Sequence, residues 1–520
     1  MLAALGGLLA GLAHPPFGVL PGLLGYGVLM IAAETAGPRP LRSAFFRGWL
    51  GGLGYFVISV WWITEAFLVD AAAHGWMAPF ALILMAGGLA LFWGGAVWLY
   101  RLADVRGPLR PLVFAGCLCL LEWVRSHIFT GFPWNLPGET WRAGGAVSQV
   151  AALVGPYALS WLTVAISATF ALVLDRGSWR VRALPPVLAA ALLAGLAGFG
   201  VARLSDAPVG EGTGPLVRIV QANIDQKEKW RPENLDAIVE SYLALSRSKP
   251  DGPQPRIIVW PEGALPAVID DLLAPGSPYA ERISAAVSPG QTLLLGANRA
   301  DYGEGGGIDY FNSLIALRGG AGGLQVTGVY DKHRLVPFGE FLPFGDLATR
   351  LGVRSLVHMP EDFTAGPPPQ PLRARGMPPV QPLICYEALF PRFAEKAATR
   401  AGLRPRWLLN VSNDAWFGAT SGPWQHLNLA SYRAIENGLP MVRSTPTGVS
   451  AIIDAYGRSS PGSRLGLGEA GIIDARLPPS ISATPYNFIG ETAFAMMLLL
   501  SLIIVGFRHL NRRNRAQLTN

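Results

Sequence analysis

Long apolar segments follow one another through the first 203 residues, and they constrain the fold of this chain more than any other feature. They span residues 2–13, 16–33, 46–68, 78–100, 109–125, 148–174 and 183–202, and another lies at 488–507. Most of them approach the roughly 20 residues that a helix needs to cross a bilayer. The sequence therefore predicts a polytopic α-helical membrane domain, residues 1–203, with about seven transmembrane helices. It also predicts a C-terminal transmembrane helix at 488–507.

The placement of arginine predicts how these helices are oriented. Arginines gather in every second loop and after the last apolar segment: Arg39, Arg42, Arg47, Arg101, Arg106, Arg110, Arg176, Arg180, Arg182, Arg508, Arg512, Arg513 and Arg515. The positive-inside rule puts these loops and the basic tail, residues 508–520, in the cytoplasm. Residues 204–485 then lie on the outer side. Because the net charge of +7 comes largely from such short loops, we expect membrane lipid and no nucleic acid as a partner.

The chain changes character after residue 204, where short apolar runs alternate with amphipathic stretches. The runs at 216–224, 255–262, 292–298, 312–319, 324–333, 381–387, 406–414, 441–454 and 471–477 are typical of strands. Helices are expected at 233–248, 278–287, 391–401 and 424–437. This pattern predicts an α/β domain at 215–480. A Pro-rich stretch at 360–379 is long enough to form a lid.

Three residues whose side chains can act in catalysis end separate strand-like runs: Glu262, Lys332 and Cys385. If they converge, the carboxylate can take the thiol proton and the thiolate can attack a carbonyl carbon. The lysine would lower the pKa of the thiol and, with the N–H of Tyr386, stabilise an oxyanion. Taken one at a time, each residue also fits a plain role: a loop charge, a solvated basic patch or a packed cysteine.

The other cysteines, Cys117 and Cys119, lie in an apolar segment and are expected to pack there, so no disulfide framework is predicted. The sequence contains no metal-ligand cluster and no phosphate-binding loop, and we expect neither a metal nor another cofactor.

Four local motifs carry a resemblance to a known family. They read WPEGALP at 260–266, YDKHRLVPFGEFLPF at 330–344, ICYEALFP at 384–391 and SNDAWFG at 412–418. In this order they resemble the carbon–nitrogen hydrolase, or nitrilase, superfamily, which implies an α-β-β-α sandwich with a Glu–Lys–Cys triad. The membrane segments on both sides narrow the resemblance to the apolipoprotein N-acyltransferase family, as do GFPWN at 131–135 and the run at 422–440.

The resemblance implies roles for single residues. Glu262 would be the general base, Lys332 the oxyanion-stabilising lysine and Cys385 the nucleophile. Supporting or substrate-binding positions would be Glu340, Tyr386, Glu387, Trp230 and Asn312. The chain departs from the family at Pro446, where asparagine is usual, so a different pocket wall is expected there. Phe338, Phe341, Leu342 and Phe344 are expected either to line a lipid-facing mouth or to form a core stripe.

The implied activity is acyl transfer at the periplasmic side of a bacterial inner membrane. Cys385 would take an acyl chain from a phospholipid, with phosphatidylethanolamine the expected donor. The thioester would then pass the chain to the α-amine of the N-terminal S-diacylglyceryl cysteine of apolipoproteins, a ping-pong sequence. One alternative is a membrane-tethered nitrilase-type amidase that hydrolyses a C–N bond. Another is a transporter or scaffold with a degenerate outer domain.

Overall fold

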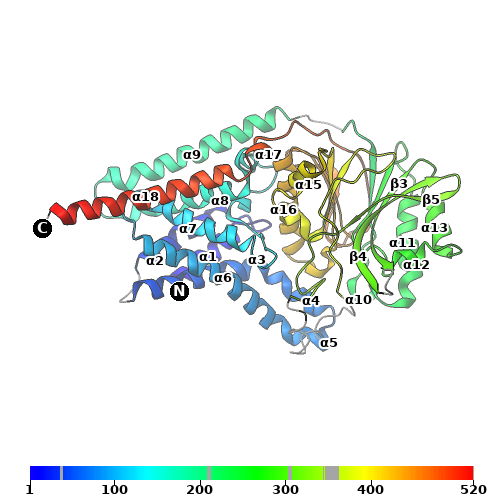
Figure 1. The fold of residues 1–520 in the computed structure, drawn as a ribbon, viewed down its shortest axis with the longest axis horizontal. Helices are drawn as coiled ribbons and strands as arrows, with labels where there is room; N and C mark the ends of the chain where they lie inside the picture. Colours follow the sequence, from blue (N-terminus) through cyan, green and yellow to red (C-terminus); the bar gives the residue numbers. More distant parts are fainter. Residues whose placement is uncertain (36–38, 208–211, 303–306, 344, 346–361, 519–520) are drawn as a thin grey trace. The chain divides into compact units, whose positions relative to one another are not determined.

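The computed structural model describes residues 1–35, 39–207, 212–302, 307–343, 345 and 362–518. The chain divides into two compact units, shown in Figure 1. The first is helical and comprises Met1–Thr64, Trp76–Ala207 and Ala483–Asn520. The second comprises Glu65–Gly75 and Pro208–Ser482 and contains both β-sheets. Residues 65–75 thus group with the sheets, although the sequence around them is that of the predicted membrane domain.

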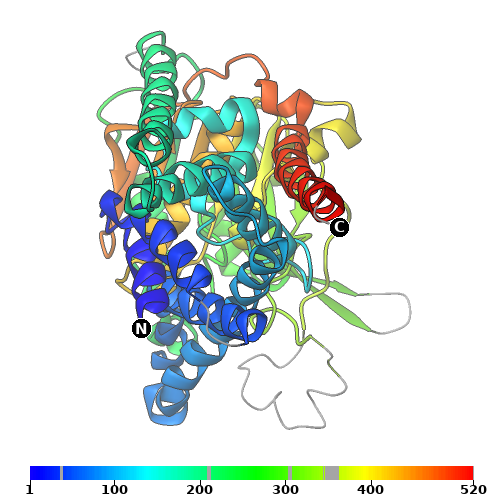
Figure 2. The same ribbon diagram turned by 90° about the vertical axis from the view of Figure 1, so that its left-hand side faces the viewer.

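The first unit is a bundle of apolar helices, seen from its own side in Figure 2. Its main members are α1 (Leu2–Leu12), α2 (Gly25–Glu34), α3 (Pro40–Val60), α6 (Ala78–Ala103), α7 (Arg110–Arg125), α8 (Ala151–Thr169), α9 (Trp179–Ser205) and α18 (Thr492–Leu518). Glycine lets two of them approach closely, because a Cβ on Gly7 of α1 would lie 1.7 Å from the carbonyl oxygen of Gly51 on α3.

Five helices of the described residues are long and apolar enough to cross a membrane: Pro40–Leu68, Ala71–Ala103, Val147–Leu174, Arg182–Ser205 and Thr492–Leu510. Leu2–Leu12 and Leu20–Glu34 are apolar but shorter. α7 has 16 residues, or about 24 Å at ~1.5 Å per residue, less than the ~30 Å hydrocarbon core. The number of seven preceding spans stays a prediction.

Ion pairs link the helices of this bundle. The Arg110 guanidinium contacts Glu34 at 2.8 Å and Asp175 at 2.6 Å, which joins α7 to the ends of two other helical segments. Arg125 pairs with Glu122 one turn earlier on α7, and both side chains are 1% exposed. Each charge is compensated by its partner, as burial in a low-dielectric environment requires.

The second unit is built on two sheets. β11 (Gly471–Arg476), β1 (Leu216–Gln221), β2 (Ile257–Trp260), β3 (Thr292–Tyr302), β4 (Ile308–Gly320) and β5 (Gly323–Asp331) form a six-stranded sheet in that order. β10 (Ser459–Leu465), β9 (Ser450–Ile453), β8 (Met441–Ser444), β7 (Trp407–Val411) and β6 (Val380–Ile384) form a five-stranded one.

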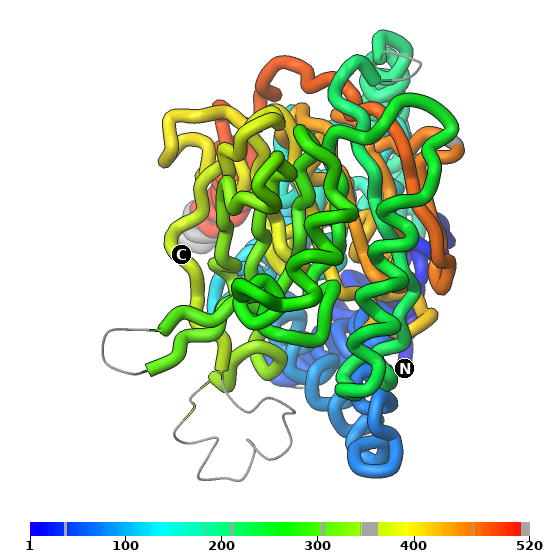
Figure 3. Tube along the Cα trace, turned by 90° about the vertical axis from the view of Figure 1, so that its right-hand side faces the viewer, coloured from blue at the N-terminus to red at the C-terminus, as the bar shows by residue number. Residues whose placement is uncertain are grey.

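The two sheets pack face to face between helices, because successive side chains of a strand point to opposite faces of the sheet and both faces are apolar. On β2, Ile257 and Val259 enter a core shared with residues of the other sheet such as Trp407, whereas Ile258 and Trp260 pack on the helix side. α11 (Leu235–Arg247), α12 (Ile269–Leu272) and α13 (Pro278–Ala286) cover the six-stranded sheet and face the viewer in Figure 3. α15 (Phe393–Ala401) and α16 (Gly422–Asn437) lie beyond the five-stranded sheet in Figure 1. The predicted α-β-β-α sandwich is confirmed.

One strand prediction was wrong, and one strand was not predicted. The run 441–454, expected to be one strand, forms the antiparallel pair β8 and β9, because the chain turns at Pro446, which has no N–H for a ladder. β10 was missed because its sequence, SSPGSRL, is polar and contains proline and glycine. Such residues are tolerated at a sheet edge, and β10 is an edge strand with an irregular register.

Candidate active site

Glu262, Lys332 and Cys385 each come directly after the end of a strand. Glu262 lies two residues beyond β2, Lys332 follows β5 and Cys385 follows β6. β2 and β5 run in the same direction, since β3 is parallel to β2 and two antiparallel pairings separate β3 from β5. The Lys332 ammonium lies 3.2 Å from Glu262 Oε1. Both side chains act electrostatically on the Cys385 thiol, so the structure brings the three predicted residues to one place.

Glu262 is held by three hydrogen bonds in a buried position. Its backbone passes close over β3, where a Cβ on Gly296 would lie 2.7 Å from the Glu262 Cα. Oε1 accepts from the Asn312 side-chain amide at 2.7 Å and from Lys332, and Oε2 accepts from the Asn413 backbone N–H at 2.6 Å. A carboxylate oxygen has two lone pairs. These partners use both lone pairs of Oε1 but only one of Oε2.

Lys332 is buried between two carboxylates. Its Nζ donates to Glu340 Oε1 at 2.9 Å as well as to Glu262, and Asn312 donates to the same Glu340 oxygen at 2.7 Å. Burial lowers the pKa of the lysine, but the two carboxylates raise it by more, so its pKa lies above the ordinary value and it stays charged. Two of its three N–H donors point at carboxylates, which leaves the third for a substrate oxygen.

Cys385 sits in a strained turn. Its φ of +47° lies in the left-handed region, which non-glycine residues avoid at a cost of about 1–3 kcal/mol. It also begins the 3₁₀ turn η9 (Cys385–Leu389). Burial raises the pKa of the thiol and Glu262 raises it further, whereas Lys332 and a hydrogen bond with Ser412 lower it by less. Lys332 thus acts in the expected direction, but burial and Glu262 outweigh it, so the pKa of the thiol lies above its ordinary value. A thiol with a raised pKa needs a base to form the thiolate.

Glu387 ties the nucleophile turn to the lysine strand. This fully buried carboxylate accepts from the backbone N–H groups of His333, Arg334 and Ile384 at 2.8, 3.2 and 2.9 Å, and from the Tyr330 hydroxyl at 3.0 Å. Two of these donors follow Lys332 and one precedes Cys385. Burial raises the pKa of Glu387 to about 7, although the backbone donors oppose the shift. Glu387 fixes the spacing of lysine and thiol without facing the reacting atoms itself.

Comparisons with known proteins identify the family. A family model described as apolipoprotein N-acyltransferase N-terminal domain matches residues 6–169, and one described as carbon-nitrogen hydrolase matches residues 216–486. An apolipoprotein N-acyltransferase of Caulobacter vibrioides is 52% identical over 504 residues, which cover 97% of this chain and 93% of that protein. One of Bradyrhizobium diazoefficiens is 38% identical over 531 residues, covering 99% and 96%. The chain belongs to the apolipoprotein N-acyltransferase family.

It is accordingly an enzyme, an acyltransferase, and a membrane protein whose two-sheet unit is a carbon–nitrogen hydrolase domain. Among solved structures, an amidase from Nesterenkonia sp. matches 52% of this chain and 93% of its own at 19% identity, with a TM-score of 0.35, a likeness too weak to carry an argument.

The remaining positions that the family resemblance implied lie at the rim or beside the centre. Tyr386 is buried, and its ring packs edge-to-face on Phe390 with centroids 5.1 Å apart. Trp230 is 52% exposed, with its ring 5.7 Å from the ammonium of Lys229.

The four apolar residues after Lys332 do not share one environment. Phe338 is 62% exposed and Leu342 is buried, whereas Phe344 lies outside the described residues. The first two residues of the expected lid, 360 and 361, also lie outside them. The rest of that segment starts against the site, because the N–H of Phe363 donates to the Glu340 carbonyl and that of Gly366 to the Lys332 carbonyl, each at 2.8 Å.

A buried polar network behind Cys385 escaped the residue-by-residue prediction. Asp414 accepts from the Ser412 hydroxyl at 2.7 Å and from Arg443 at 2.6 Å, and it lies 3.0 Å from His426 Nδ1. His426 Nε2 lies 3.3 Å from the Cys385 carbonyl oxygen. The motifs SNDAWFG and GPWQH contain these residues and were noted only for their resemblance. No local pattern shows that three segments meet under the nucleophile.

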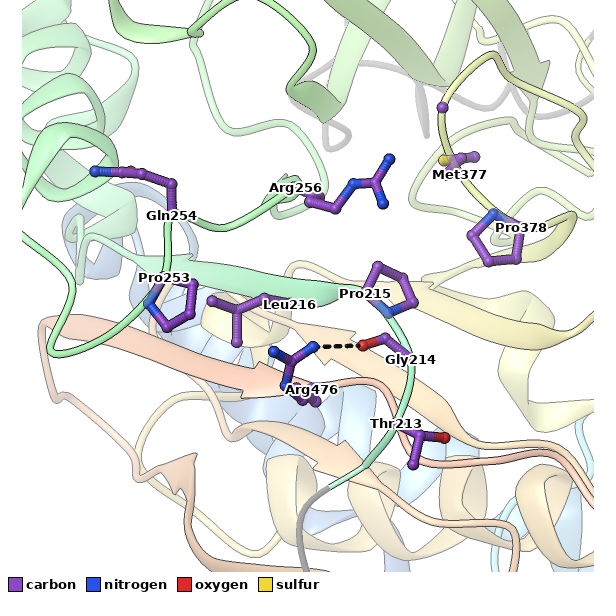
Figure 4. Close-up of a pocket in the computed structure, with 11 residues that line it drawn as sticks. Thr213, Gly214, Pro215, Leu216, Pro253, Gln254, Arg256, Met377, Pro378 and Arg476 are labelled. Carbon is purple, nitrogen blue, oxygen red and sulfur yellow. Dashed lines mark hydrogen bonds between the residues drawn. The ribbon is translucent and has the colours of Figure 1, made fainter.

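A surface hollow of about 620 Å³ lies at the other edge of the sheets, where β1 and β2 begin. Arg256 and Arg476 line it with Met377, and Arg476 donates to the Gly214 carbonyl at 3.3 Å (Figure 4). Because Glu262 and Cys385 follow the opposite ends of their strands, this hollow is separate from the candidate active site.

Proposed function

We propose that Cys385 receives an acyl chain from a phospholipid and passes it, through a thioester, to the α-amine of an S-diacylglyceryl cysteine on an apolipoprotein. The observation that carries this mechanism is the hydrogen-bonded cluster of Glu262, Lys332 and Glu340 beside a half-buried thiol on a left-handed turn. The cluster has a base, a fixed cation and a nucleophile whose raised pKa makes that base necessary.

In the first step, Glu262 Oε2 takes the Sγ proton of Cys385 while the sulfur attacks the ester carbonyl carbon. The third N–H of Lys332 and the backbone N–H of Tyr386 stabilise the negative charge that develops on the carbonyl oxygen. The tetrahedral intermediate collapses by breaking the bond to the glycerol oxygen. Glu262 returns its proton to that oxygen, the lysophospholipid leaves, and Cys385 holds the acyl chain as a thioester.

In the second step, the neutral α-amine of the acceptor attacks the thioester carbonyl. Glu262 accepts a proton from the attacking nitrogen, the carbon–sulfur bond breaks, and the proton passes to the departing sulfur. The product is an amide, and Cys385 is restored as a thiol. A water molecule in place of the amine would give hydrolysis, so the wall made by Trp230, Tyr386 and the segment after residue 362 decides how well water is excluded.

The membrane unit supports this proposal because both substrates carry acyl chains and reside in the bilayer. We propose phosphatidylethanolamine as the donor. We also propose that the two-sheet unit faces the periplasm at the inner membrane, since the arginine-rich loops would then be cytoplasmic.

Mass spectrometry of the purified full-length enzyme tests the proposal. After incubation with phosphatidylethanolamine in mixed micelles, the peptide containing Cys385 should carry one acyl chain, which a diacylglyceryl lipopeptide should then remove as an N-acyl product. Cys385→Ser should give no thioester. Release of free fatty acid without transfer to the lipopeptide would overturn the acyltransferase mechanism in favour of hydrolysis.

A further inference from the structure

Lys229 is a second buried lysine beside the catalytic centre, and neither the motifs nor the triad account for it. It ends the short helix α10 (Gln226–Lys229) and is 2% exposed. Its Nζ donates to the carbonyl oxygen of Gly263, the residue directly after Glu262. Gly263 has a φ of +52°, so the residue whose carbonyl binds the ammonium is in the left-handed region.

The same helix contacts the other side of this turn. The Asn413 side-chain amide donates to Gln226 at 3.4 Å, and the Asn413 backbone N–H donates to Glu262 Oε2 at 2.6 Å. The helix α10 is therefore linked to Glu262 in two ways. Lys229 binds the carbonyl of Gly263, and Gln226 binds Asn413, whose backbone N–H donates to the Glu262 carboxylate.

Lys229 contributes to the charge balance of the catalytic cluster. Among the described residues of the catalytic cluster, Glu262 and Glu340 are two carboxylates that share the single ammonium of Lys332. That set alone carries an excess negative charge, which would oppose the formation of a thiolate at Cys385. The Lys229 ammonium adds a second positive charge next to Glu262, which balances the two carboxylates of this set.

We propose that Lys229 is a positioning residue for the general base: it holds the Glu262–Gly263 turn and supplies the second positive charge of the site. This inference rests on the proposed function, because it assigns proton transfer from Cys385 to Glu262. The ammonium acts through Glu262 and does not itself contact the reacting thiol.

The charge on Lys229 is sensitive to pH. Burial lowers the pKa of its ammonium to about 8, although Glu262 opposes the shift. Glu262 is the charged side chain that acts on it from another element, and Asp225 and Glu228 of its own segment are exposed. We therefore expect acylation of Cys385 to slow as the pH rises through about 8.

Folding stability should not fall over the same pH range. A lysine whose pKa is lowered in the folded state binds fewer protons there than in the unfolded chain between about pH 8 and the ordinary lysine pKa of 10.5. This group therefore makes the protein more stable as the pH rises over that range. Activity and stability therefore move in opposite directions, which separates loss of charge from unfolding.

The experiment measures the rate of acyl-adduct formation on Cys385 from phosphatidylethanolamine mixed micelles between pH 6 and 10, with full-length enzyme. Lys229→Met should be slower at pH 7 by about tenfold or more, the equivalent of one pKa unit of electrostatic stabilisation, and should show no further fall near pH 8. Lys229→Arg keeps the charge and should be faster than Lys229→Met, with the alkaline fall displaced upward. Lys227→Met, an exposed position on the same helix, should match the wild type.

Equal rates for Lys229→Met and the wild type would overturn the inference. So would equal losses in the Met and Arg variants with an unchanged thermal unfolding profile, since that pattern shows that the charge is irrelevant. A wild-type enzyme that forms no adduct on Cys385 would instead refute the proposed function, because the inference concerns only how fast that adduct forms.

Discussion

The Glu387 carboxylate accepts a hydrogen bond at 2.8 Å from the backbone N–H of His333, although the two residues are 54 positions apart in the sequence. Glu387 comes two residues after Cys385, and His333 comes directly after Lys332. Together with the bonds from Arg334 and Tyr330 to the same carboxylate, this contact ties the turn that presents the nucleophile to the strand that presents the cation. Preorganisation of this kind matters because a misplacement of about 1 Å can cost roughly 100-fold in rate.

Glu262→Gln should speed the alkylation of Cys385 and slow its acylation. The Glu262 charge raises the pKa of the thiol, so removing it should make Cys385 ionise more readily and react faster with iodoacetamide at pH 8. Acyl-adduct formation should fall by about 100-fold or more, because the base is lost. Both rates are measured by intact-protein mass spectrometry, with Glu281→Gln, an exposed position on α13, as control. Parallel changes in alkylation and acylation would show that Glu262 is not the base.

Loss of the Tyr330 hydroxyl should weaken the link at Glu387 without breaking it. Tyr330→Phe removes one donor at 3.0 Å and should destabilise the folded state by about 1–3 kcal/mol. Glu387→Ala should be far more damaging, because three buried backbone N–H groups then lose their acceptor. Thermal unfolding in detergent measures both effects, and Tyr302→Phe at a 65% exposed position is the control. Equal midpoints for Tyr330→Phe and the wild type would refute the contact's contribution.

The raised pKa of Glu387 predicts a pH dependence of stability. Its pKa is about 7 in the folded enzyme against an ordinary glutamate pKa of 4.5, so the folded state binds more protons between these values. The contribution of this group is therefore fully present below about pH 4.5 and is lost as the pH rises through 7. Glu387→Gln does not titrate, and its unfolding midpoint should vary less than that of the wild type over this interval. A midpoint that varies equally in both proteins would contradict the assignment.

Gly448 should tolerate no side chain, because a Cβ there would lie 2.7 Å from the Asp414 Cβ under the nucleophile turn. We expect Gly448→Ala to lower stability by about 1–3 kcal/mol through overpacking and to slow acylation. Gly320→Ala is the matched control, since its nearest contact would be an ordinary 3.6 Å.

Pro446, where the chain departs from the family pattern, should matter less for acylation than Gly448. The carbonyl of Pro446 accepts from the Asn223 backbone N–H at 2.8 Å, a bond that alanine can keep. We therefore expect Pro446→Ala to form the acyl adduct at close to the wild-type rate. A loss as large as that of Gly448→Ala would show that the proline ring itself shapes the pocket.

Local sequence was sufficient for the class of fold and for the candidate residues. Long apolar segments predicted the membrane helices and short apolar runs the strands, since both signals depend on neighbours in the chain. Glu262, Lys332 and Cys385 could be named because each ends a strand-like run within a recognisable motif. The polar edge strand β10 carried no such signal, and the turn at Pro446 was hidden inside a continuous apolar run.

Tertiary structure alone decided the electrostatics of the site. Lys332 and Lys229 have the same side chain, yet one has its pKa raised between two carboxylates and the other has it lowered by burial. Sequence reasoning expected Lys332 to lower the pKa of the Cys385 thiol, and it does, but burial raises that pKa by more. Desolvation and charge–charge energies depend on distances between segments that are remote in the chain, so they exist only once the two sheets have packed together.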